Sequence, residues 1–118
     1  MTHPSEKSEL IYLASPYSHP EDAVREQNFV KVSQAAAKLT AEGKVVISPI
    51  TYGHTLVGFH QMPVDWAFWE NFCISILSRC DKLIVYKMEG WDQSRGLDAE
   101  VKYAIAKGIP VEYLEREK

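Results

Sequence analysis

The chain has 118 residues, 46% of them hydrophobic and 25% charged, and a formal net charge of −3 at pH 7. This length and composition predict one globular domain over residues 1–118 with a substantial core. The sequence has no basic block and no apolar run of membrane-spanning length, which argues against nucleic-acid and membrane partners and for a cytoplasmic protein.

Residues 1–9 are polar, and we expect them to be disordered. A first buried strand is predicted over residues 10–14, where an apolar run ends at a serine and a proline. The next helix starts near residue 18, either with a serine–glutamate capping box or with a histidine cap before a proline. Its apolar stripe continues to about residue 42, where a glycine follows.

Residues 44–48 form a second short apolar strand that a proline ends. Between residues 50 and 64 the hydrophobic periodicity fades, and glycines, histidines and a proline accumulate. We therefore expect a loop, and loops of this length in a small domain are often functional. His54 lies in this segment and is a candidate donor to a ligand.

A second helix is predicted from residue 63 to about 79. Its two cysteines, Cys73 and Cys80, are about 10 Å apart along a helix, too far for a disulfide between them. Neither belongs to a Cys–Cys or Cys–His pair with metal-binding spacing, so we expect no metal and no cofactor.

Aromatic residues are concentrated on this second helix. We expect Trp66, Phe68 and Trp69 to pack in the core or between subunits rather than to stack on a ligand. A domain this small with so many apolar helix residues is predicted to form a homodimer or a larger even-numbered assembly.

Residues 82–87 form a third buried strand, and the helix after it ends at Gly108. Ser94 is predicted to cap that helix, whose free N–H groups suit an anion. Gly96 is small enough for a ligand to approach the backbone. Glu100 lies at the edge of the apolar stripe, so it is either a partly buried carboxylate near the anion site or a solvated helix residue.

A last strand is predicted over residues 109–114. The alternation of strands and helices predicts an α/β fold: a small doubly wound, flavodoxin-like parallel sheet of four to five strands with helices on both faces and strand order 2-1-3-4. Ligands bind such sheets beyond the strand C-termini at the switch point, here between strands 1 and 3. Residues 14–18, 48–54 and 87–100 should therefore surround one crevice.

Four pieces of sequence, three of them around this crevice, form a recognisable set. They are Ile-Tyr-Leu-Ala-Ser-Pro-Tyr at residues 11–17, Ser48-Pro49-Ile50 with His54, Cys80-Asp81, and Ser94-x-Gly96-x-x-x-Glu100. In this order and spacing they resemble the nucleoside 2-deoxyribosyltransferase superfamily, and most closely its small stand-alone members, which include nucleotide N-glycosidases. The resemblance covers nearly the whole chain, from residue 11 to residue 114.

The resemblance implies that Glu100 is the nucleophile, which attacks the anomeric carbon of the sugar and forms a glycosyl-enzyme ester. Tyr12 would contact the sugar and hold this carboxylate in place. Ser94 and Gly96 would hold the 5′ end of a nucleotide.

Four further residues are candidate substrate contacts. Ser15 belongs to the turn after the first strand, and Tyr17 and Trp91 lie on loops beside the crevice, where they are candidates to stack on a base. His54 is a candidate donor to base or phosphate.

Two departures from the family pattern bear on activity. Members of the family usually carry an aspartate where this chain has Cys73, and we interpret this cysteine as a core residue rather than a catalytic one. Phosphate-binding hydrolases of the family carry a Gly-Ser-x-Arg turn after the first strand, and this chain lacks the arginine. Arg25 on the first helix is either its substitute or a solvated helix residue.

The sequence thus favours a nucleotide or nucleoside N-glycosidase or deoxyribosyltransferase-like enzyme with a small-molecule substrate. The alternatives are a catalytically weak or inactive nucleotide-binding protein, which Cys73 favours, and an interaction module built on the Trp-rich helix. A zinc deaminase is disfavoured because the chain has no His-x-Glu and Cys-x-x-Cys set.

Overall fold

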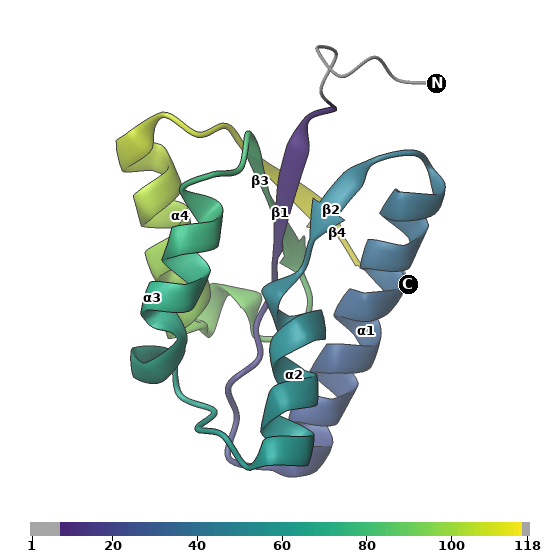
Figure 1. The fold of residues 1–118 in the computed structure, drawn as a ribbon, viewed down its shortest axis with the longest axis vertical. Coiled ribbons are helices and arrows are strands. Elements are labelled where there is room, and N and C mark those ends of the chain that lie inside the picture. The colour runs from purple at the N-terminus through teal and green to yellow at the C-terminus, as the bar shows by residue number, and fades with distance from the viewer. Residues whose placement is uncertain (1–7, 117–118) are drawn as a thin grey trace.

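A parallel sheet of four strands forms the centre of the chain (Figure 1). The strands are β1 (Leu10–Ala14), β2 (Val45–Ile47), β3 (Lys82–Lys87) and β4 (Val111–Glu115), in the order β2-β1-β3-β4. The fold class, the strand number and the strand order are as predicted. The computed structural model describes residues 8–116. The expected disorder of residues 1–9 falls mostly outside that range, although Glu9 lies within it and pairs with Lys82.

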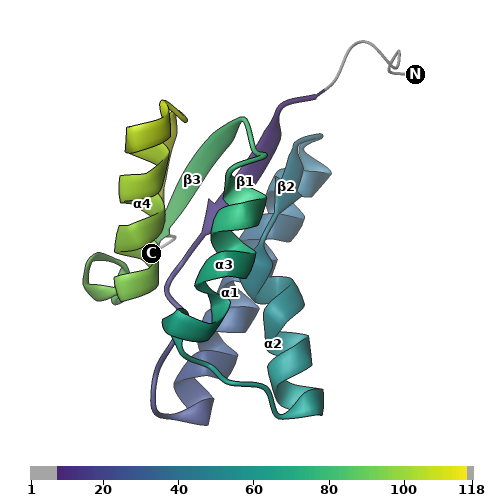
Figure 2. The ribbon, with the colours of Figure 1, turned by 60° about the vertical axis from the view of Figure 1, so that its left-hand side comes forward.

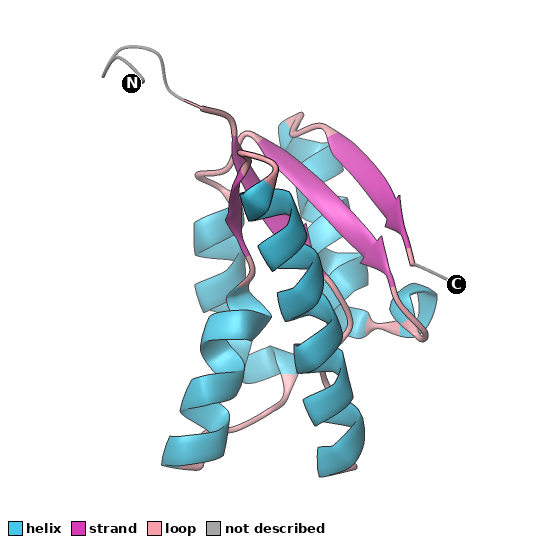
Figure 3. Cartoon of the chain, turned by 90° about the vertical axis from the view of Figure 1, so that its right-hand side faces the viewer, coloured by secondary structure: helices cyan, strands magenta, loops and turns pink. Residues whose placement is uncertain are grey.

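Helices cover both faces of the sheet (Figures 1 and 2). They are α1 (Asp22–Ala41), α2 (Pro49–His60), α3 (Trp66–Leu77) and α4 (Arg95–Lys107), with a 3-10 turn, η1 (Trp91–Gln93), before α4. The α1 helix lies on one face, and α3 and α4 lie on the other. Figure 3 shows β4 at the edge of the sheet, beside β3.

Alternation along β1 explains the two layers. Ile11 and Leu13 point toward α1, where they pack with Val32 and the rest of one apolar cluster. Tyr12 and Ala14 point to the opposite face, into a second cluster formed with α3 and α4. These four side chains of β1 are buried, as expected for a central strand of a doubly covered parallel sheet.

The loop predicted over residues 50–64 is wrong for most of its length, because α2 occupies it. Pro49 ends the strand but also provides the first helical position, and the Ser48 hydroxyl caps the helix by accepting from the Thr51 N–H at 3.3 Å. Gly53 is unfavourable inside a helix, yet it lies buried within α2, where a Cβ would make only ordinary contact with the Trp69 ring, at 3.6 Å.

The predicted helix starts also need correction. Both predicted caps of α1 are wrong, because Glu21 is the N-cap and makes no side-chain cap hydrogen bond. The Ser18 hydroxyl instead donates to the Val64 carbonyl at 2.8 Å, which ties the loop after β1 to the segment before α3. That helix begins three residues later than predicted, with Asp65 as its cap.

Ile105, which the helical spacing assigns to the buried face of α4, is exposed. Both cysteines are free thiols, as their spacing predicts. Within residues 8–116, none of the helices combines the length and the apolar character that crossing a membrane requires.

Candidate functional site

A cleft of about 410 Å³ opens beyond the C-terminal end of β1, between α2, α3 and the start of α4. Seven of the predicted site residues line it: Tyr12, Ser15, Tyr17, His54, Ser94, Gly96 and Glu100. The cleft therefore lies at the switch point between β1 and β3, where doubly wound sheets bind ligands.

The floor of the cleft holds a buried tyrosine–carboxylate pair. Tyr12 comes from the middle of β1 and Glu100 from the second turn of α4, 88 residues later in the chain, and the tyrosine hydroxyl donates to Oε2 of the carboxylate. Both residues line the cleft although almost nothing of either is exposed, 1% of Tyr12 and 6% of Glu100. The sequence was compatible with either a buried or a solvated carboxylate at Glu100, and the structure shows that it is buried.

Burial governs the titration of this pair. Desolvation raises the pKa of Glu100 to about 7, and the hydrogen bond from Tyr12 offsets only part of that shift. Burial also raises the pKa of the Tyr12 hydroxyl, and the neighbouring carboxylate adds to the effect. Tyr12 therefore stays a hydrogen-bond donor, while Glu100 changes its charge within the physiological range.

Cys73 lies on α3 beside this pair. It is half-buried, packs against the apolar cluster around Tyr12 and also lines the cleft, so it is both a core residue and a residue of the cleft wall. Burial, followed by the nearby Glu100 carboxylate, raises the pKa of its thiol to about 12. The group is thus a neutral thiol at physiological pH.

The start of α4 forms a second wall. The Ser94 hydroxyl accepts from the Leu97 N–H at 3.2 Å and so caps the helix as predicted. Gly96 is needed for a reason that the sequence did not show: a Cβ at this position would lie 2.8 Å from Cε3 of Trp66. The glycine thus admits the indole ring of α3, and the free N–H groups of the helix start face the same cleft as Arg95.

Several residues of the wall were not predicted to face a ligand, and three of them have side chains suited to one. Trp66 and Trp69 line the cleft, although their helical spacing favours a core or an interface, and Arg95 lines it directly after the cap. Their position offered a signal, because each lies in the first turns of a helix that starts at the edge of the sheet where the strands end.

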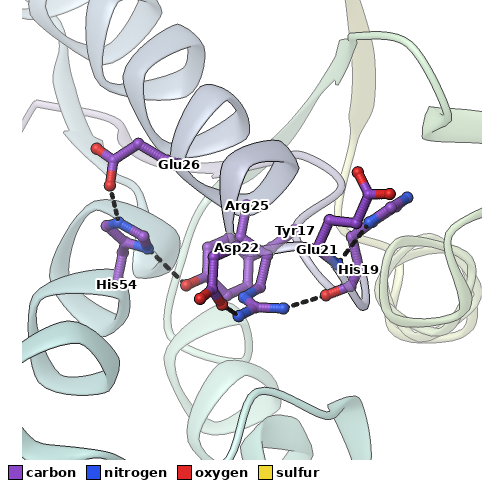
Figure 4. A network of polar contacts seen from close by, with 7 residues as sticks. All are labelled: Tyr17, His19, Glu21, Asp22, Arg25, Glu26 and His54. Carbon is purple, nitrogen blue, oxygen red and sulfur yellow. Dashed lines mark hydrogen bonds and ion pairs between the residues drawn. The ribbon is translucent and has the colours of Figure 1, made fainter.

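The loop after β1 and α2 form the third wall, which Figure 4 shows from close by. Oη of Tyr17 lies 2.5 Å from Nδ1 of His54, and Nε2 of that histidine lies 3.1 Å from Oε1 of Glu26. The imidazole ring stacks on Phe29, with ring centroids 4.4 Å apart. Glu26 and Phe29 come from α1, so the packing of α1 against α2 fixes the histidine.

Ser15 and Trp91, two further residues predicted to contact the substrate, differ in their relation to the cleft. Ser15 is buried at the cleft, and its hydroxyl has no hydrogen-bond partner within the described part of the chain, so a polar group of a ligand can satisfy it. Trp91 is not part of the cleft lining. It packs edge-on against Tyr113 of β4, with Lys87 over its ring.

Arg25 does not take the place of the missing turn arginine. Its guanidinium donates to the His19 carbonyl and pairs with Asp22, which closes the loop after β1, and it is absent from the cleft lining (Figure 4). The cationic side chain that lines the cleft is instead Arg95.

The cleft thus combines a buried carboxylate held by a tyrosine, aromatic side chains on two walls and a helix N-terminus beside an arginine. Aromatic faces stack on bases, and a helix start with a cation suits a phosphate. Among the described residues, no cluster of three or more histidine, cysteine or acidic side chains is arranged to hold a metal ion.

Comparison with models of protein families gives a match over nearly the whole chain. A search of curated proteins finds no match to the chain. Residues 9–116 match a family model described as "Domain of unknown function (DUF1937)", and because this match covers nearly all of the sequence, the chain belongs to the DUF1937 family.

Proposed function

We propose that the protein is a nucleotide or nucleoside N-glycosidase, or a deoxyribosyltransferase-like enzyme, that cleaves the N-glycosidic bond with Glu100 as nucleophile. The observation that carries the proposal is the buried Tyr12–Glu100 pair on the floor of a cleft with aromatic walls. A carboxylate in such a place stabilises an oxocarbenium-like transition state and then bonds to it.

The proposed reaction has two steps. An oxygen of the Glu100 carboxylate attacks the anomeric carbon while the bond from that carbon to the base nitrogen breaks, and the bonding electrons leave with the base, which gains a proton. The resulting glycosyl ester is then attacked by water in a hydrolase, or by a second base in a transferase, which restores the carboxylate. Tyr12 holds the carboxylate in line through its hydrogen bond.

The walls support a nucleotide as the substrate. Tyr17, Trp66 and Trp69 offer ring faces for a base. Arg95 and the N-terminus of α4, with Ser15 nearby in the cleft, offer positive charge and a free hydroxyl for the 5′ end. A cytoplasmic location belongs to the same proposal and fits the two free thiols.

A direct assay tests the proposal. The four common deoxynucleotides and four ribonucleotides, each as nucleoside and as 5′-monophosphate, are incubated with the protein, and free base is measured by chromatography. Release of one base by the wild type, and none by Glu100→Gln, is expected. Binding of a nucleotide without any base release would favour the second candidate, a non-catalytic nucleotide-binding protein, which the thiol at position 73 supports.

The pH dependence of the reaction follows from Glu100. Only its carboxylate is a nucleophile, and burial raises its pKa to about 7, so kcat/KM should rise with pH and reach half of its plateau near pH 7 on the acidic limb. Initial rates at subsaturating substrate between about pH 5 and about pH 9 measure this limb. A rate that is already constant above about pH 5 would show that the group in use is an ordinary, solvated carboxylate.

We also propose a homodimer or a larger even-numbered assembly. β2 is an edge strand whose Val45 and Ile47 are exposed, and Tyr52 and Phe68 on the adjacent helices are exposed as well. Light scattering at micromolar concentration should give at least twice the chain mass, and Ile47→Lys should shift it toward the monomer. The matched control is Ile105→Lys, on the exposed side of α4, which should leave the mass unchanged. A wild-type monomer would refute the proposal.

A further inference from the structure

Glu26, His54 and Tyr17 form a chain of hydrogen bonds that leads from solvent into the cleft (Figure 4). The Glu26 side chain is 61% exposed, whereas the His54 side chain is only 16% exposed. Tyr17 and His54 line the cleft and Glu26 does not. The three groups therefore connect a solvated carboxylate on α1 with a phenol hydroxyl at the ligand site.

The chemistry of Glu26 sets the direction of one hydrogen bond, and the charge of the imidazole sets the direction of the other. An ionised carboxylate only accepts, so Nε2 of His54 carries a proton and donates it to Glu26. When the imidazole is neutral, its Nδ1 accepts from the Tyr17 hydroxyl. When the imidazole is protonated, Nδ1 donates to Oη of Tyr17, and the tyrosine proton is free to point into the cleft.

Packing holds these rings in place. The imidazole is stacked between its neighbours, with Phe29 parallel to it and the Tyr17 ring edge-on at 5.5 Å. Charged groups near the pair include Arg25, which interacts with Tyr17 from α1 and pairs with Asp22, and Asp65, which lines the cleft from the segment before α3. The arrangement is preorganised before any ligand enters.

Departure of a base needs a proton, and the floor of the cleft does not supply one. Glu100 must be ionised to act as nucleophile, and Tyr12 already donates its proton to that carboxylate. Cys73 is a neutral thiol in apolar packing, a poor acid. The third wall holds a connected chain of exchangeable protons, from His54 to Tyr17, that lines the cleft.

We propose that Tyr17 donates the proton to the departing base and that His54, held by Glu26, reloads it, an inference that rests on the proposed N-glycosidase function. As the glycosidic bond breaks, the Tyr17 proton passes to the base nitrogen that receives the bonding electrons. The proton on Nδ1 of His54 passes at the same time to Oη of Tyr17, which leaves a neutral phenol and a neutral imidazole. After the base has left, water in the cleft returns a proton to Nδ1 of His54, while Nε2 keeps its own proton and its hydrogen bond to Glu26. Tyr17 acts on the substrate, and His54 and Glu26 are positioning residues.

The test compares leaving groups. Tyr17→Phe removes the donor, and Glu26→Gln keeps a hydrogen-bond acceptor for Nε2 but removes its charge. Each variant is assayed on the nucleotide that the wild type cleaves and on the 4-nitrophenyl glycoside of the same sugar, whose nitrophenolate leaves as a stable anion without a proton. Because a general acid contributes typically about 10²–10⁴-fold, Tyr17→Phe should lose at least about tenfold more activity on the nucleotide than on the nitrophenyl glycoside. Glu26→Gln should show the same selectivity to a smaller degree.

The solvent deuterium isotope effect on base release gives an independent reading that does not require the artificial substrate. It should be normal in the wild type and fall toward unity in Tyr17→Phe, because no proton then moves in the slow step. Tyr52→Phe, a hydroxyl deletion on the exposed side of α2, is the matched control and should change neither measurement.

The outcomes separate this proposal from the proposed function. An equal loss on both substrates, or an isotope effect that survives in Tyr17→Phe, would overturn the relay, and the N-glycosidase would stand as long as Glu100→Gln is inactive. If the wild type releases no base from any nucleotide or nucleoside, the proposed function itself fails and the relay with it.

Discussion

Replacement of Glu100 by glutamine is expected to lower base release by roughly 10⁴-fold, the scale seen when one member of a covalent catalytic set is removed. The amide has the shape of the carboxylate and can still accept from the Tyr12 hydroxyl, so the cleft keeps its form. It cannot form the glycosyl ester, because it carries no negative charge and is a poor nucleophile. Free base released from the substrate of the wild type measures the effect.

The same substitution should stabilise the fold, and the sign depends on pH. The folded chain holds a proton on Glu100 up to about pH 7, whereas the unfolded chain releases it near 4.5. Between these values the folded state binds more protons, so the wild type loses stability as pH rises and stays destabilised above pH 7. Glu100→Gln has no such loss and should gain up to about 3 kcal/mol at pH 8, a difference that vanishes as the pH falls to about 4.5.

Denaturant unfolding of the two proteins at pH 8 and at pH 5 measures this difference. Glu89→Gln makes the same chemical change at an exposed residue outside the cleft, so it should not alter the pH dependence of unfolding. Equal stabilities of the wild type and Glu100→Gln at pH 8 would mean that the carboxylate is solvated in the folded protein. Glu100 would then not be a buried nucleophile with a raised pKa.

Most of the fold could be predicted from the sequence, because its strands and helices follow from local patterns of residues. The strands β1 and β3 are apolar runs, and the alternation of strands with helices leaves few topologies, so the sheet, its order and the switch point followed from pattern alone. The segment that failed was α2, because Gly53 and Pro49 are read locally as breakers. Pro49 instead occupies the first helical position, where no N–H is needed, and Gly53 is accommodated in a helix that is buried against Trp69.

The candidate site likewise contains residues whose positions the sequence could predict and residues whose positions it could not. Tyr12 and Glu100 could be placed at one edge of the sheet from topology and resemblance, since each follows from its position in an element. Glu26 could not, because it lies on the exposed side of α1 and meets His54 only through the packing of α1 against α2. Trp91 was misplaced for a related reason: it follows the correct strand, but the η1 turn carries its ring toward β4. Contacts between elements, rather than properties of one element, limit the inference.

Replacement of Cys73 by aspartate restores the usual residue of the resembled superfamily and is expected to create a second proton donor. The carboxyl would stand beside Glu100 in a half-buried wall, and two acids in such a place cannot both ionise at neutral pH. One of them keeps a proton, which is available to a departing base. The substitution should cost about 1–3 kcal/mol of stability, because a polar group replaces a thiol in apolar packing.

The size of the gain depends on whether Tyr17 already supplies the proton. In the wild-type background Cys73→Asp should raise base release only a few-fold, whereas in Tyr17→Phe it should recover about 10²-fold, because general acid catalysis is then missing. Cys73→Asn has a similar shape but no acid and should rescue neither background, and Cys73→Ala should change turnover little if the thiol only packs. Single-turnover base release from all combinations measures the coupling. A loss of all activity in Cys73→Ala would identify the thiol itself as catalytic, and equal gains in both backgrounds would show that Tyr17 and the new acid do not serve the same step.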